Sequence, residues 1–175
     1  MNYFIDLGCG KGETIEEFNN WKVLFNQEPF KIYGFDPNPG FSEEWAKMRK
    51  ERPEVKLIQA AAWTKDGKID FSSHPNSESS SIMKEKNTYK DGKIITVPCF
   101  DFSFWLKSII KPNDFVLVKM DIEGAEMELL PKMIKEGTDE LISILLVEWH
   151  DYKMDRESNK RWIWDNLKCT WYHWR

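Results

Sequence analysis

Apolar residues occur along this chain in short continuous runs, and between the runs they recur three or four positions apart. Short apolar runs bounded by turn-forming residues indicate buried strands, whereas the wider spacing indicates amphipathic helices. The run LISILLV at residues 141–147 is the most apolar, and FVLVKM at residues 115–120 is similar. The pattern predicts strands at residues 2–7, 31–35, 55–62, 69–73, 94–98, 115–120, 141–147 and 170–174.

Helices are expected between most of these strands. Residues 13–21 (ETIEEFNNW) have acids in the first turn, which favours a helix N-terminus. Ser42 is expected to cap the next helix, in which Trp45 and Met48 share one face. Further helices are predicted at residues 100–110, 122–137 and 157–167.

Strands that alternate with helices predict an α/β fold: a doubly wound, mostly parallel sheet with helices on both faces. The chain has 175 residues, enough for one such domain spanning residues 1–175. Ligands bind to sheets of this kind at the carboxyl ends of the strands, near the point where strand order reverses. The end of the first strand is therefore the expected location of a functional site.

The amino-acid composition limits which classes of partner and which cellular compartment are expected. The net charge of −4 lacks the basic excess of nucleic-acid-binding domains, so there is no strong signal for a nucleic-acid partner. No window approaches the ~20 apolar residues of a membrane span, and the N-terminus does not read as a signal peptide, so no membrane partner is expected. Three widely spaced cysteines without CxxC pairing suggest a reduced, cytoplasmic protein.

A glycine-rich motif, DLGCGKG, follows the first strand. Gly8 and Gly10 let the backbone turn sharply and approach a ligand. Alone, such a turn fits a dinucleotide, a nucleoside or no ligand. However, Asp6 would repel a pyrophosphate and would suit a cationic ligand, such as the α-amino group of a methionine moiety. The motif also lacks the G-x-G-x-x-G dinucleotide fingerprint, and it is not a P-loop.

Acidic residues end three later strands. Asp36 can accept both hydroxyls of a ribose, a role favoured over that of a capping acid in a Pro-rich turn. Asp121 follows FVLVKM, and Glu148 and His150 follow LISILLV, so all three should border the same cleft. Glu126 is expected instead to stabilise a helix N-terminus.

Taken together, DLGCGKGET, FDPNP, AAAW, VKMDIEGAEMELL and LLVEWH resemble the FkbM family of methyltransferases, over about Phe4 to His150. VKMDIEGAE, with a glutamate after the next strand, is the discriminating part. Members often carry Asn where this chain has Gly10. The part after His150 has room for about one helix and one strand, so the closing β-hairpin is expected to be incomplete.

The resemblance implies an S-adenosylmethionine-dependent enzyme that methylates a hydroxyl of a small molecule or glycan. The resemblance implies that Asp6 helps to hold the amino group of the cofactor and that Gly8 and Gly10 pass under its methionine and ribose. It also implies that Asp36 binds the ribose hydroxyls and that Ala61 and Ala62 lie beside the adenine. A hydroxyl acceptor needs a general base, for which Asp121, Glu148 and His150 are the candidates. Their spacing does not demand a metal ion, and none is expected.

Other functions remain open. An open site would admit a protein or nucleic-acid acceptor, and a chain that lost its substrate half would be a non-catalytic nucleoside-binding module. A nicotinamide-dependent oxidoreductase is disfavoured by the glycine spacing and by Asp6. The aromatic C-terminal part is expected mainly to pack in the core or at an edge, and secondly to form a homo-oligomer contact; it comprises Trp162, Trp164, Trp171, Tyr172 and Trp174.

Overall fold

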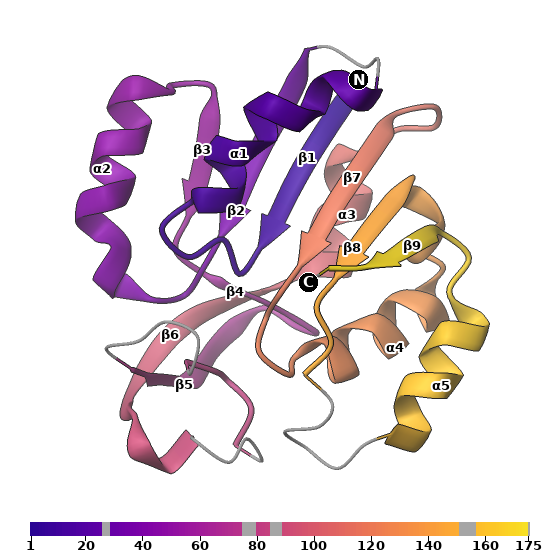
Figure 1. Cartoon of the computed structure of the whole chain (residues 1–175). Helices are drawn as coiled ribbons and strands as arrows, with labels where there is room; N and C mark the ends of the chain where they lie inside the picture. The colour runs from indigo at the N-terminus through magenta and orange to yellow at the C-terminus, as the bar shows by residue number, and fades with distance from the viewer. Residues whose placement is uncertain (26–28, 75–79, 85–88, 151–156, 175) are drawn as a thin grey trace.

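Six parallel strands form the central sheet of the computed structural model (Figure 1). The structure describes residues 1–25, 29–74, 80–84, 89–150 and 157–174. The strand order is β3-β2-β1-β7-β8-β9, and every neighbouring pair is parallel. The strands are β1 (Asn2–Leu7), β2 (Phe30–Phe35), β3 (Val55–Ile58), β7 (Phe115–Met120), β8 (Ile144–Val147) and β9 (Thr170–His173).

The strand order reverses between β1 and β7. From β1 the chain builds outward through β2 and β3, and it later returns to build β7, β8 and β9 on the other side. Leu7 is in register with Phe35 of β2 and with Met120 of β7, so the three strands end at the same level. This arrangement confirms the predicted doubly wound sheet, with its switch point at the end of β1.

Helices cover both faces of the sheet (Figure 1). Alternate residues of β1 face opposite layers: Ile5 packs with the layer that contains α3, α4 and α5, whereas Phe4 packs with α1 and α2. Both side chains are fully buried, as expected for a parallel sheet covered on two sides. The helices are α1 (Glu13–Trp21), α2 (Ser42–Glu51), α3 (Phe102–Ile109), α4 (Glu126–Glu136) and α5 (Glu157–Asn166).

A second, three-stranded sheet has the order β4-β6-β5 and lies below the carboxyl ends of the main strands (Figure 1). It comprises β4 (Ala61–Trp63), β5 (Gly67–Ser73) and β6 (Lys93–Asp101). The single strand predicted at residues 55–62 is therefore wrong, because the chain leaves the main sheet after Ile58. The amide of Ala60 donates to the carbonyl of Ile58 at 3.0 Å in a tight turn, which a continuous apolar run does not reveal.

Two helix starts also differ from the prediction. Ser42 does not cap α2: the N-cap is Phe41, and the side chain of Asn38 instead caps the preceding 3-10 turn (Pro39–Phe41). Helix α4 begins at Glu126, and not at Ile122, because the residues between them form a turn. This turn places Glu123 at φ 57°, outside helical geometry.

The C-terminal part of the described chain contributes one helix, α5, and one strand, β9, which pairs in parallel with β8. Residues 157–174 thus form the one helix and one strand that were expected. The Trp149 ring packs against Trp164 and Trp171, with centroids 5.9 and 6.0 Å away, at the edge of the sheet formed by β9. Core packing is not what the other aromatic residues show, because Trp162, Trp164 and Tyr172 are exposed and Trp171 and Trp174 are half-buried. Among the described residues, no helix has the length and apolar character needed to cross a bilayer.

The layered core makes a prediction about α3, where Phe102 is fully buried and Phe104 is 68% exposed. Phe102→Ala should lower the free energy of unfolding by about 3–5 kcal/mol, because it removes buried apolar area and leaves a cavity. The same change at Phe104 should stay within about 0.5 kcal/mol. Urea unfolding of the two variants measures the difference, and equal midpoints would contradict the layering.

Candidate active site

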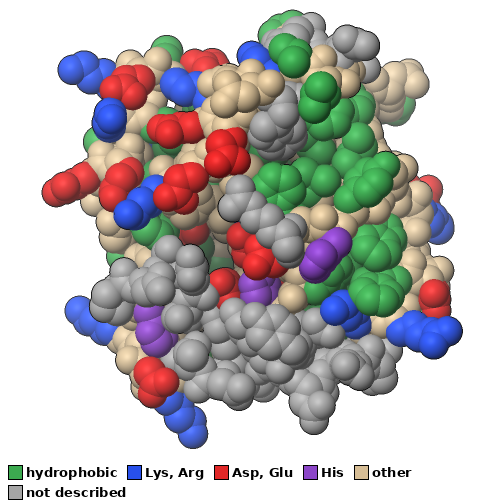
Figure 2. Space-filling view, viewed as in Figure 1, with side chains coloured by type: hydrophobic (Ala, Val, Ile, Leu, Met, Phe, Trp, Pro, Cys, Tyr) green, Lys and Arg blue, Asp and Glu red, His purple; other side chains and the backbone are tan. Residues whose placement is uncertain are grey.

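A cavity of about 880 Å³ opens at the carboxyl ends of β1, β2 and β7, where the strand order reverses. Its volume is in the range of about 300–1,000 Å³ that is typical of cofactor and ligand sites. On this side of the molecule, acidic side chains and a histidine gather near the centre of the view (Figure 2). Every predicted site residue except Asp6 lines the cavity: Gly8, Gly10, Asp36, Ala61, Ala62, Asp121, Glu148 and His150.

The glycine turn after β1 is held closely against its neighbours. The amides of Gly8 and Cys9 both donate to the carbonyl of Phe35, at 2.8 and 3.1 Å. Gly8 has φ 76°, and a Cβ at this position would lie 1.7 Å from the carbonyl oxygen of Asp121. A residue without a side chain is therefore required where the ends of β1 and β7 meet. A Cβ on Gly10 would meet no atom within 4 Å, so the turn leaves space there for a ligand.

Asp36 fixes this turn from the end of β2. One carboxylate oxygen accepts from the amide of Gly10 at 3.0 Å, and the other accepts from the amide of Asn38 at 2.8 Å. Burial raises the pKa of Asp36 to about 6, and the two amide hydrogen bonds oppose that rise. The carboxylate both organises its own turn and faces the cavity, so the capping and ligand-binding interpretations are compatible.

Asp6 is fully buried and contacts Lys119, which itself lines the cavity. The Lys119 ammonium lies 3.2 Å from an oxygen of Asp6, 3.2 Å from an oxygen of Asp121 and 3.3 Å from the carbonyl of Gly8. Burial works against the charge on Lys119, but the two carboxylates outweigh it and raise the lysine pKa. Burial also raises the pKa of Asp6, although Lys119 counteracts that shift. The lysine thus links β1 to the end of β7.

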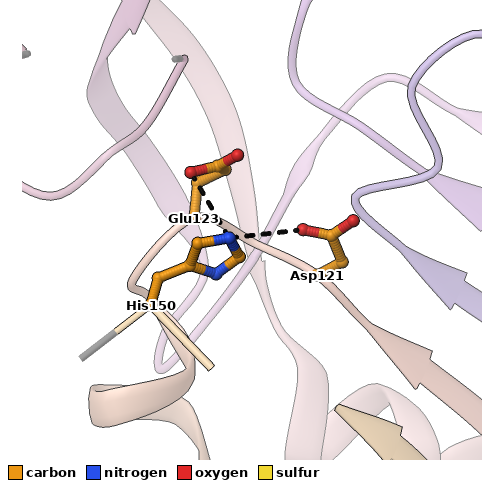
Figure 3. A group of neighbouring side chains, drawn as sticks. All are labelled: Asp121, Glu123 and His150. Carbon is orange, nitrogen blue, oxygen red and sulfur yellow. Dashed lines mark ion pairs between the residues drawn. The ribbon is translucent and has the colours of Figure 1, made fainter. Parts of the chain in front are cut away.

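His150 stands among four carboxylates and is only 3% exposed. Its Nδ1 lies 3.2 Å from Glu126, while Nε2 lies 3.5 Å from Glu148, 3.6 Å from Glu123 and 3.9 Å from Asp121. Asp121, Glu123 and His150 converge from the loops after β7 and β8 (Figure 3). Burial favours the neutral ring, but the hydrogen bond with Glu126 and the nearby carboxylates raise the pKa of His150. Because a carboxylate only accepts, we assign a proton to Nδ1, so Nε2 faces the acidic groups.

Glu126 orients the histidine ring and also organises the turn before α4. Its fully buried carboxylate accepts from the amides of Ile122 and Gly124, each at 2.8 Å. Glu126 was predicted to stabilise the N-terminus of the helix. Its hydrogen bonds instead stabilise the turn that directly precedes the helix. The same carboxylate fixes His150, a second role that its position in the sequence does not reveal.

Glu148 is the most accessible acid of this group, with its side chain 33% exposed. Burial and the neighbouring charge of Asp121 raise the pKa of Glu148, and His150 acts in the opposite direction. A carboxylate with a raised pKa is a better proton acceptor than an ordinary surface acid. Across the cavity, Ala61 and Ala62 are buried and form a wall of small side chains.

Three residues of the site were not predicted from the sequence: Lys119 as a bridging cation, Glu123 as a cavity acid and Glu126 as the partner of His150. Lys119 carried a usable signal, because a lysine in the apolar run FVLVKM needs a buried partner. For Glu123 and Glu126, the sequence contains no signal that distinguishes them from acids at an ordinary helix N-terminus.

The sequence profile described as "Methyltransferase FkbM domain" matches residues 9–166. The chain belongs to the FkbM methyltransferase family. The match begins inside the glycine turn and extends to the end of α5, so it covers the switch point and the His150 cluster. Comparison of the chain with curated proteins and with solved structures gave no significant match. The family assignment supports methyltransferase activity in general.

The buried lysine makes a prediction about stability. Lys119→Met should lower the free energy of unfolding by about 3–5 kcal/mol, because it leaves buried Asp6 without its compensating charge. Adding Asp6→Asn should restore part of the loss, since the uncompensated carboxylate is then gone. Urea unfolding followed by circular dichroism measures both effects, with Lys47→Met on the exposed face of α2 as the control. A double variant as unstable as the single one would contradict the ion-pair account.

Proposed function

We propose that this FkbM-family methyltransferase uses S-adenosylmethionine to methylate a hydroxyl group of a small molecule or glycan. The observation that carries the proposal is one cavity that joins a glycine turn, a ribose-type acid and a carboxylate–histidine cluster. The glycine turn and Asp36 lie on the side of β1 and β2, while Asp121, Glu148 and His150 lie beyond β7 and β8. A donor and an acceptor would thus meet at the switch point.

The residues present fit this cofactor. The empty space beside Gly10 admits a ligand next to the backbone, and Asp36 keeps acceptor capacity for ribose hydroxyls beyond its two amide bonds. Ala61 and Ala62 leave room for a flat adenine ring. Asp6 is buried against Lys119, so we propose that its role toward the cofactor amino group is indirect, through the turn and the lysine.

When bound, S-adenosylmethionine supplies an electrophilic methyl group that an acceptor oxygen attacks in line. The chain's own residues hold the acceptor and remove its proton. Glu148, with a raised pKa and the greatest exposure in the cluster, accepts the hydroxyl proton. Asp121 and His150 border the same space and help to hold the acceptor in place. We also propose a cytoplasmic location, which the three free cysteines support.

Calorimetric titration with S-adenosylmethionine and, separately, NAD tests the cofactor. We expect the methyl donor alone to bind, and Asp36→Ala to weaken its Kd by more than about tenfold, because two charge-assisted hydrogen bonds are lost. Asp165→Ala, on the exposed face of α5, should leave the Kd unchanged. If neither the donor nor its demethylated product binds, the proposed cofactor is wrong. Donor binding without transfer to any small hydroxyl compound would leave a protein or nucleic-acid acceptor, or a non-catalytic nucleoside-binding module.

The raised pKa of Asp36 predicts a pH dependence of donor binding. Above about pH 6 the side chain is ionised and accepts ribose hydroxyls well, and protonation below that value removes the charge. Between pH 7 and pH 5 the Kd should therefore weaken by up to about tenfold, as the ionised fraction falls. Asp36→Asn should bind more weakly at pH 7 and respond less to pH. An equal pH response in both proteins would show that another group is responsible.

A further inference from the structure

Three side chains at the cavity wall are placed as the ligands of one metal ion would be. His150 Nε2, an oxygen of Asp121 and an oxygen of Glu123 all lie within 4.8 Å of one another. The Nε2 atom is 3.6 Å from Glu123 and 3.9 Å from Asp121, beyond the hydrogen-bond range of about 2.7–3.2 Å. Around an ion with bonds of about 2.1 Å, adjacent donors lie about 3.0 Å apart and opposite donors about 4.2 Å apart. The two separations measured from Nε2, 3.6 and 3.9 Å, fall between these two values.

The imidazole ring is held in the orientation that a metal ligand needs. Its Nδ1 pairs with Glu126 at 3.2 Å, and Glu126 is itself fixed by two backbone amides. A carboxylate that holds the far nitrogen of a ligating histidine is a recurrent feature of protein metal sites. Among the described residues, no hydrogen bond reaches Nε2, although the His150 side chain is only 3% exposed. The buried Nε2 atom therefore faces the carboxylates of Asp121 and Glu123 without a hydrogen bond to either of them (Figure 3).

The charges around Nε2 call for a cation. The Nε2 edge of the ring faces an oxygen of Asp121 and an oxygen of Glu123, and the negative charges of these two carboxylates repel each other. Lys119 lies on the far side of Asp121: its ammonium contacts the other oxygen of that carboxylate and Asp6. One Asp121 oxygen is thus neutralised by the lysine while the second faces His150. A cation between Nε2 and these oxygens would convert the repulsion into attraction.

We propose that Asp121, Glu123 and His150 bind one divalent metal ion of the Mn²⁺ and Mg²⁺ class. The two carboxylates are hard oxygen donors that suit these ions, and the imidazole favours Mn²⁺ over Mg²⁺. Three protein ligands leave coordination positions open for water and for an acceptor oxygen. The earlier expectation of no metal considered spacing alone, and it did not include Glu123.

The metal's part in the reaction rests on the proposed function. A divalent cation makes a bound hydroxyl easier to deprotonate and holds its oxygen in place. Glu148 has an oxygen 3.5 Å from Nε2 and lies outside the ligand set, so it stays available to accept that proton. The oxygen's electron pair then forms the new bond to the methyl carbon, and the electrons of the broken carbon–sulfur bond remain on sulfur.

Direct metal titration tests the site without relying on activity. Mn²⁺ is added to the full chain after chelator treatment, and unbound Mn²⁺ is followed by electron paramagnetic resonance. We expect one ion to bind per chain, Mg²⁺ to compete for it, and Glu123→Gln to weaken the Kd by at least about tenfold. Glu43→Gln, the same change on exposed α2, should bind Mn²⁺ like the wild type. Circular dichroism checks that each variant is folded, and Asp121→Asn is the second ligand variant.

No saturable Mn²⁺ binding, or equal binding by wild type and both ligand variants, would overturn the metal site. Titration of S-adenosylmethionine without metal distinguishes a failure of the metal site from a failure of the proposed function. Donor binding without Mn²⁺ binding would leave the cluster as a histidine paired with carboxylates and reject only the ion. Mn²⁺ binding lost in Glu123→Gln, without donor binding, would support the ion site and reject the proposed cofactor.

Discussion

A single buried cation joins the two halves of the sheet at the point where strand order reverses. Lys119 projects from β7, contacts Asp6 of β1, Asp121 after β7 and the carbonyl of Gly8, and is almost completely buried. A charge at this depth is tolerated only when carboxylates and hydrogen bonds surround it. Its position therefore ties the glycine turn to the loop that carries the acidic residues. It also decides which oxygen of Asp121 remains turned toward the cavity.

At the end of β2, one side chain likewise both fixes the backbone and faces the cavity. Asp36 uses both oxygens to hold backbone amides on either side of the cavity edge, and its own burial raises its pKa. Gly8 must lack a side chain because the backbone of Asp121 occupies the space where a Cβ would lie. Residues that a ligand would contact are thus also the residues that fix the loops. A substitution at Asp36 consequently changes both the local backbone and any bound ligand, and the two effects need separate measurements.

Hydrophobic patterning predicted most of the sheet, because parallel strands buried on both faces, such as β7, read as continuous apolar runs. It failed at residues 55–62, since an apolar run does not show that a chain passes from one sheet to another. The position of acids after the strands predicted which side chains reach the cavity. It did not predict the grouping of Glu123 with His150, which depends on a turn where Glu123 adopts φ 57°. Distances between loops are set by tertiary packing and are not encoded in local spacing.

The acidic character of the cavity bears on how methyl transfer would proceed. A sulfonium is positively charged before transfer, whereas the thioether product is neutral, so carboxylates beside it favour the reactant over the transition state. Asp121, Glu123 and Glu148 would act in this unhelpful direction if their charges faced the donor alone. A divalent cation among them would neutralise much of that field and would stabilise negative charge developing on the acceptor oxygen. The proposed ion would therefore make the acidic cluster more favourable for this chemistry, since it would direct the carboxylates toward the acceptor and away from the donor.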